Sequence, residues 1–110
     1  MEEKVLGKIS WAEFGTVKDF PFLFGLQLRF SMKGCGVGDG SKYTVNVEPS
    51  CKAWSTPKER TTTITQYMEK VDIILGEAGV NYVSELVGKP VEIVLENNTF
   101  KDFRILTEVL

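Results

Sequence analysis

The stretch FLFGLQLRFSMKGCGVGDG, from Phe22 to Gly40, decides the fold class of this chain. Every second residue of its first half is apolar: Phe22, Phe24, Leu26, Leu28, Phe30 and Met32. This period of two predicts a β-strand with one buried face and one face in water. The strand, which ends near Lys33, leads into a segment with four glycines: Gly34, Gly36, Gly38 and Gly40.

The glycine segment, Gly34 to Gly40, has three interpretations that the sequence leaves open. It can be a flexible hairpin connection, because glycine adopts positive φ angles at little cost. It can form a nest of backbone N–H groups for a phosphate, with charge from Lys33 and Lys42 on either side. It can also be a loop that orders on contact with a protein. A P-loop or Rossmann site is not indicated, because no GKS or GKT ends the segment and no helix is predicted to follow.

Four further strands are predicted around this one. A first strand covers Val5 to Phe14, and Gly15 to Pro21 connects it to the second. Alternation from Lys42 to Glu48 predicts a third strand that pairs with the second and ends at Pro49. The last two strands are Pro90 to Glu96 and Phe103 to Val109, with a turn at Asn97 and Asn98 after the first of them.

One long helix is predicted from Thr63 to Ala78. Its apolar stripe repeats at helical spacing, at Ile64, Tyr67, Met68, Val71, Ile74, Leu75 and Ala78. Thr63 and Gln66 match a capping box, and Gly79 is a natural C-terminal stop. Ser50 to Thr62 is expected to be irregular. Asn81 to Gly88 is expected to hold a short helical turn with Val83, Leu86 and Val87 directed inward.

The element order β-β-β-α-β-β predicts a single α+β domain over residues 1–110. We expect a twisted antiparallel sheet of about five strands with the helix on one face; the sheet is either highly twisted and open or partly closed like a small barrel. The predicted core comprises Phe24, Leu26, Leu28, Phe30, Tyr67, Val71, Leu75, Ile93, Leu95 and Phe103.

Composition restricts the possible functions. The chain has 110 residues, 43% apolar and 25% charged, as in an ordinary soluble domain. A net charge of −2 argues against broad binding to DNA or RNA. The chain has no run of 18 apolar residues for a membrane helix, and its first residues, MEEKVLGK, have no apolar core of a secretory signal. We therefore expect a cytoplasmic protein.

The absence of histidine removes Ser-His-Asp and Cys-His catalysis. Cys35 and Cys51 are expected to be reduced in the cytoplasm, and two cysteines without histidine do not make a standard zinc site. No spacing nominates a paired nucleophile and base. We therefore expect a protein that is not an enzyme and that needs no metal or cofactor.

A small-anion or nucleotide site is one candidate for the binding activity. It combines the glycine segment with Lys33, Lys42, Tyr43, Trp54, Arg60 and the helix start near Thr63. Backbone amides would hold a phosphate, an aromatic ring would stack on a base, and a cation would balance charge. The alternative for Trp54 is that it closes the edge of the core, since tryptophan is mostly buried.

A protein interface is the other candidate. Leu23, Val94 and Leu106 are apolar residues on otherwise polar strand faces, and they can contact a partner or bury a homodimer interface. Glu92, Glu96 and Glu108 lie at outward positions of the last two strands. They form either a solvated face or an acidic surface that imitates nucleic acid.

The chain resembles a loosely defined group of small phage and prophage proteins of unknown function. The resemblance rests on KISWAEFG, on a long strand that ends in the glycine-rich KGCGVGDG, and on VSELVGKPVEIVLEN after the helix. It implies a phage accessory protein that acts in the host cytoplasm. The leading expectation is a binding protein that inhibits a host factor, such as a CRISPR-type defence component. The alternatives are a sponge for a nucleotide or cyclic-nucleotide immune signal, and a structural or assembly protein of a phage.

Overall fold

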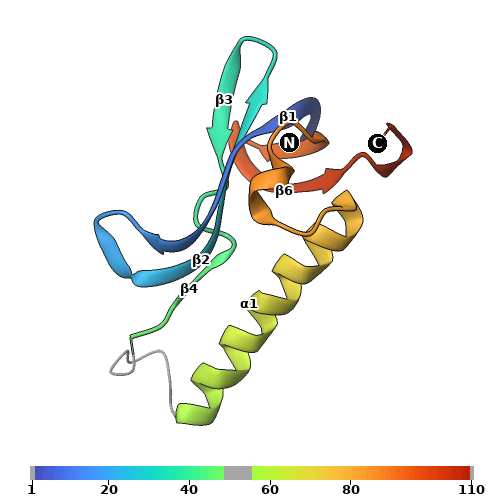
Figure 1. Cartoon of the computed structure of the whole chain (residues 1–110). Helices are drawn as coiled ribbons and strands as arrows, with labels where there is room; N and C mark the ends of the chain where they lie inside the picture. The colour runs from blue at the N-terminus through green and yellow to red at the C-terminus, as the bar shows by residue number, and fades with distance from the viewer. Residues whose placement is uncertain (1, 49–55, 110) are drawn as a thin grey trace.

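The computed structural model describes residues 2–48 and 56–109 and shows an α+β fold, as predicted (Figure 1). The chain forms, in order, β1 (Glu2–Val17), β2 (Phe20–Met32), β3 (Cys35–Gly38), β4 (Thr44–Asn46), α1 (Pro57–Ala78), η1 (Val83–Leu86), β5 (Pro90–Glu96), β6 (Thr99–Ile105) and η2 (Thr107–Val109).

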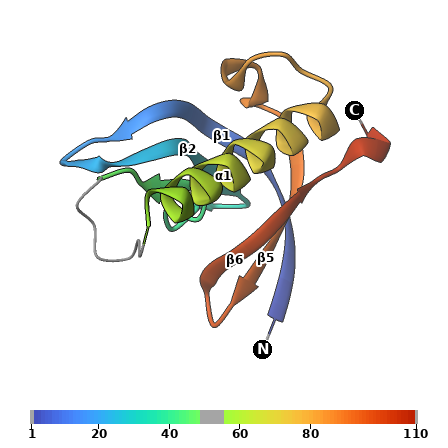
Figure 2. The same ribbon diagram turned by 90° about the horizontal axis from the view of Figure 1, so that it is seen from below.

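All six strands belong to one antiparallel sheet with the order β3-β2-β1-β5-β6, and β4 pairs with β2 beside β3. The sheet does not close into a barrel, because β3 and β6 lie at opposite ends of this order. The helix α1 crosses one face between the β1–β2 hairpin and the β5–β6 hairpin (Figure 2).

The β1–β2 hairpin is longer and tighter than predicted. β1 extends beyond Val5–Phe14 because its first half pairs with β5, from Glu2 to Lys8. The connection is a short turn at Lys18 and Asp19, not Gly15 to Pro21. Asp19 adopts a φ of 70°, a conformation that Asp tolerates better than most residues.

The core lies on the sheet face that α1 covers. Its most completely buried side chains include Leu26, Leu28 and Phe30 of β2, each at most 1% exposed. Val71, Ile93 and Leu95 are also buried, as predicted. Four residues of the predicted core are only partly buried, so the prediction overestimated their burial: Phe24, Tyr67, Leu75 and Phe103. Among the described residues, eight more belong to the buried core cluster: Ile9, Ala12, Tyr43, Ile74, Ala78, Leu86, Val91 and Ile105.

The helix begins at Pro57, so the predicted start at Thr63 was wrong. Thr56 is the N-cap, and its side-chain oxygen accepts a hydrogen bond from the backbone N–H of Glu59 at 3.2 Å. The helix ends as predicted at Gly79, which has a φ of 70°. Among the residues of α1, the buried ones are Val71, Ile74 and Ala78, all in its C-terminal half. The N-terminal half is less buried, although Arg60 hydrogen-bonds to the carbonyl oxygen of Val47 next to β4.

The structure changes the bounds of two other strands. β4 covers only Thr44–Asn46 of the predicted strand from Lys42 to Glu48, although it pairs with β2 as expected. The last strand is Thr99–Ile105, because a 3-10 turn follows it. The predicted turn at Asn97 and Asn98 is confirmed, with φ values of 53° and 65°.

The short helical turn is confirmed as η1, Val83–Leu86. Leu86 is fully buried, but Val87 is 50% exposed, so its predicted inward direction was wrong.

Candidate binding surface

The glycine segment is not a loop. Lys33 and Gly34 form a turn, and Cys35–Gly38 then forms β3, which pairs with Arg29 to Met32 of β2. Gly36 and Gly38 are therefore strand residues, whereas Gly34 and Gly40 occupy turns with φ of 79° and 63°. The interpretation as a flexible connection was wrong for most of the segment.

Asp39 lies within the glycine segment that the sequence suggested as a possible phosphate nest. It is 8% exposed, and its carboxylate accepts hydrogen bonds from the backbone N–H groups of Leu28, at 2.9 Å, and Ser41, at 3.0 Å. Burial raises the pKa of this carboxyl, while the backbone hydrogen bonds act in the opposite direction. An amide that an anion nest would use is thus already bonded within the chain.

Two side chains of the predicted anion site are engaged elsewhere. The Lys42 ammonium lies 2.7 Å from the carbonyl oxygen of Lys101 and 3.3 Å from a carboxylate oxygen of Asp102. The Arg60 guanidinium donates two hydrogen bonds, of 3.0 and 2.7 Å, to the carbonyl oxygen of Val47. These cations therefore hold backbone segments in place.

The other described residues of the predicted anion site are either buried or lie far from one another in the fold. Tyr43 is 6% exposed, and burial raises the pKa of its hydroxyl, so its ring is not available to stack on a base. Thr63 lies inside α1, not at its start. Lys33 is at the tip of the β2–β3 hairpin, which points away from α1 (Figure 1). Trp54 lies outside the described residues.

The predicted acidic face is partly neutralised. Glu92 and Glu108 contact the Arg104 guanidinium at 3.1 and 3.5 Å, and Glu96 lies 3.4 Å from the Lys101 ammonium. Cations therefore alternate with carboxylates on these strands, which agrees with the solvated interpretation and not with a uniform acidic surface.

Three phenylalanines near the end of the β1–β2 hairpin form an exposed aromatic surface, defined here as Phe14, Phe20 and Phe22. They are 38%, 51% and 41% exposed. Phe14 lies opposite Leu26 in the register and packs edge to face on Phe24 at 5.2 Å. Phe20 and Phe22 pack edge to face at 6.1 Å. The aromatic surface is therefore continuous with the face of the sheet that carries the core.

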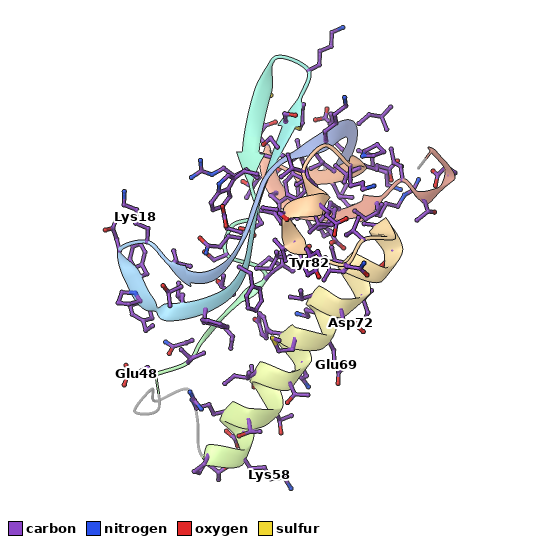
Figure 3. All side chains as sticks on the ribbon, in the orientation of Figure 1. Lys18, Glu48, Lys58, Glu69, Asp72 and Tyr82 are labelled. Atoms are coloured by element: carbon purple, nitrogen blue, oxygen red, sulfur yellow. The ribbon has the colours of Figure 1, made fainter. Side chains whose placement is uncertain are left out.

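The aromatic surface is exposed because α1 does not extend over it. The fully buried residues of α1 all lie in its C-terminal half, and the helix begins short of the tip of the β1–β2 hairpin (Figures 1 and 2). Lys18 marks the outer tip of that hairpin, and Glu69 and Asp72 point away from the sheet on the other side of α1 (Figure 3). Phe22, which the predicted core did not include, follows the same alternation as Leu26 and Leu28 but is 41% exposed.

The predicted interface residues are less accessible than the aromatic surface. Leu23, Val94 and Leu106 are only partly exposed, and Leu23 lies opposite Asn46 of β4. The sequence missed Phe20 and Phe22 as interface residues, although their position beside the turn at Lys18 and Asp19 was a usable signal.

The concave regions of the described structure include the following two. An apolar pocket of about 370 Å³ is lined by Val5, Met32, Val37 and Leu95, with polar groups from Glu3, Lys33, Cys35 and Asn98. A groove of about 290 Å³ lies between α1 and β6, beside Ile74 and Phe103. Lys33 and Gly36 line the pocket, whereas Tyr43 lines the groove, so the described parts of the predicted anion site do not share one cavity.

Comparisons with protein-family models, with curated proteins and with solved structures found no match to this chain. Within residues 2–48 and 56–109, no group of three or more Cys, Asp or Glu side chains is placed to hold a metal ion. No helix in the described part of the chain is long and apolar enough to cross a membrane.

Proposed function

We propose that this protein is a non-enzymatic binding protein that contacts another protein through Phe14, Phe20 and Phe22. The observation that carries the proposal is the exposure of three aromatic side chains on the β1–β2 hairpin, two of which pack on each other. Exposed apolar patches often mark interaction sites, and aromatic side chains supply much of the binding energy of protein interfaces.

The chemistry of the surface favours a protein partner. Phenyl rings offer apolar area without hydrogen-bonding groups, so they fit an apolar pocket or groove better than a phosphate. The resemblance to small phage proteins directs the search to bacterial proteins, and to defence components such as CRISPR-type effectors first. The proposed consequence of binding is inhibition of such a host factor.

The test compares capture of proteins from a bacterial lysate by the wild type and by the double variant Phe20→Ser, Phe22→Ser. A second double variant, Leu6→Ser with Val87→Ser, removes apolar residues that are 68% and 50% exposed but lie outside the aromatic surface. We expect a partner that binds the wild type and this control but not the phenylalanine variant.

The captured protein must then bind the purified wild type directly. Thermal unfolding shows whether both variants remain folded. Equal capture by the phenylalanine variant and the wild type would reject the aromatic surface as the binding site.

A further inference from the structure

The free edge of β3 presents the backbone of two glycines to solvent. Asp39 and Leu28 face each other across β2 and β3: the Asp39 N–H donates to the Leu28 carbonyl at 3.1 Å, and the Leu28 N–H donates to the Asp39 carboxylate. In an antiparallel ladder, hydrogen-bonded and non-hydrogen-bonded pairs alternate. The N–H and C=O groups of Gly36 and Gly38 therefore point away from β2.

The rest of the sheet supports this assignment. The Leu26 N–H donates to the Tyr43 carbonyl oxygen, and the Phe22 carbonyl oxygen accepts from the Val47 N–H. The backbone N–H and C=O groups of even-numbered β2 residues therefore point toward β3 and β4. Within the register, Val37 lies opposite Phe30 and Cys35 opposite Met32, whereas Gly36 and Gly38 lie opposite odd-numbered residues. No other described strand pairs with β3, which ends the strand order.

This edge lacks the features that usually protect an edge strand. Natural edges carry charged residues, proline or bulges, which prevent pairing with another chain. Cys35–Gly38 contains no charge and no proline. The neighbouring carboxylate of Asp39 is directed inward to Leu28 and Ser41. Gly36 and Gly38 are exposed and have no side chains, so another backbone can approach closely.

We propose that β3 pairs with β3 of a second copy of this chain, antiparallel and around a two-fold axis at Val37. In this register Gly36 of each copy lies opposite Gly38 of the other, so the outward N–H and C=O groups form four interchain hydrogen bonds. The two Val37 side chains meet at the axis as a non-hydrogen-bonded pair. The arrangement is self-complementary, because a two-fold axis brings the same edge of both copies together.

A four-residue edge is small for an interface, so the dimer forms weakly and depends on protein concentration. The inference is independent of the proposed function, because β3 lies outside the aromatic surface.

Disulfide trapping tests the register. With Cys35→Ser and Cys51→Ser as the background, Val37→Cys places two thiols at a pair whose Cα atoms are about 4.5 Å apart, within the range that a disulfide spans. We expect a covalent dimer on oxidation, formed at least tenfold faster than by Lys18→Cys in the same background. Restoring Cys35 alone gives no such acceleration, because Cys35 faces Asp39 of the other copy.

A matched pair of variants tests the hydrogen bonds. Gly38→Pro removes an outward N–H without breaking a bond to β2, and edge strands tolerate such a proline. Gly38→Ala keeps that N–H, and its Cβ would have no heavy atom within 4 Å. We expect Gly38→Pro to abolish the rapid crosslinking and the concentration-dependent mass increase in sedimentation, and Gly38→Ala to retain both.

The proposal is overturned if Val37→Cys crosslinks no faster than Lys18→Cys, or if folded Gly38→Pro crosslinks like its parent. Loss of dimer in Phe20→Ser, Phe22→Ser with retention in Gly38→Pro would place the dimer interface on the aromatic surface instead. Whether Phe20→Ser, Phe22→Ser loses lysate capture tests the proposed function and has no bearing on the pairing of β3.

Discussion

Removing the Asp39 carboxylate by Asp39→Ala should destabilise the fold mainly through one backbone amide. The Leu28 N–H donates to this carboxylate at 2.9 Å, and Leu28 is 1% exposed, so the variant loses the acceptor of a buried donor. An unsatisfied buried donor costs about 1–3 kcal/mol. Ser41 is exposed, so its N–H regains a bond to water and adds little to the loss.

The expected effect is large enough to measure. Unfolding entropy is about 2.1 cal/mol/K per residue, so a loss of about 2 kcal/mol in a chain of 110 residues lowers Tm by about 9 °C. Thermal unfolding followed by circular dichroism gives the change in Tm, and amide hydrogen exchange reports the Leu28 N–H directly.

Asp102→Ala is the matched control. The Asp102 carboxylate also accepts a backbone hydrogen bond, from Phe103 at 2.8 Å, and contacts the Lys42 ammonium, but its side chain is 58% exposed. Its removal should cost less than about 1 kcal/mol. The reasoning is refuted if both variants have the same Tm, or if the Leu28 amide stays as protected in Asp39→Ala as in the wild type.

The remaining predictions concern pH, the start of α1 and two glycines. Burial raises the pKa of Asp39 in the folded protein above its ordinary value of 3.8. Between that ordinary value and the raised pKa, the native state holds a proton on this carboxyl that the unfolded state has released. The wild type should therefore lose stability relative to Asp39→Asn as pH rises through this window, and a constant difference in urea midpoint would contradict it. Thr56→Ala should cost about 1 kcal/mol in urea unfolding, because Thr56 caps α1, whereas Thr63→Ala within the helix should change stability by less than about 0.5 kcal/mol. Gly7→Ala should destabilise by at least about 1–3 kcal/mol, because its Cβ would lie 2.4 Å from the Ser31 carbonyl oxygen, whereas Gly76→Ala in α1 should stabilise by about 0.5–1 kcal/mol. A higher Tm for Gly7→Ala would refute that contact.

The parts of the fold that depend on local pattern were predictable. Alternation alone placed β2 and its buried residues Leu26, Leu28 and Phe30, and Gly79 marked the end of α1. The start of α1 was not predictable in this way, because Thr61, Thr62 and Thr63 have low helix propensity and suggested a helix boundary. The structure shows Thr61 and Thr65 donating to carbonyl oxygens one turn earlier, which lets these hydroxyls stay within the helix.

The glycine segment was misinterpreted because its structure depends on β2. Glycine favours loops when judged residue by residue, but β3 forms where Phe30 lies opposite Val37. The ladder continues through a side chain, since Asp39 supplies to Leu28 the acceptor that a backbone carbonyl would give. A sequence pattern shows that Asp39 lies between glycines, but not which distant amide its carboxylate meets.

The aromatic surface was hidden by the same pattern that revealed the core. Phe22 and Leu26 obey one period of two, and that period indicates which face a side chain occupies, not how far along the strand the face is covered. Coverage is set by α1, whose first buried residue is Val71. Phe20 and Phe22, near the turn at Lys18 and Asp19, therefore lie on the core face but outside the core. A protein that left this face without a partner would expose apolar area at no benefit to its own stability, and this is the physical reason for the proposal that the surface binds a partner.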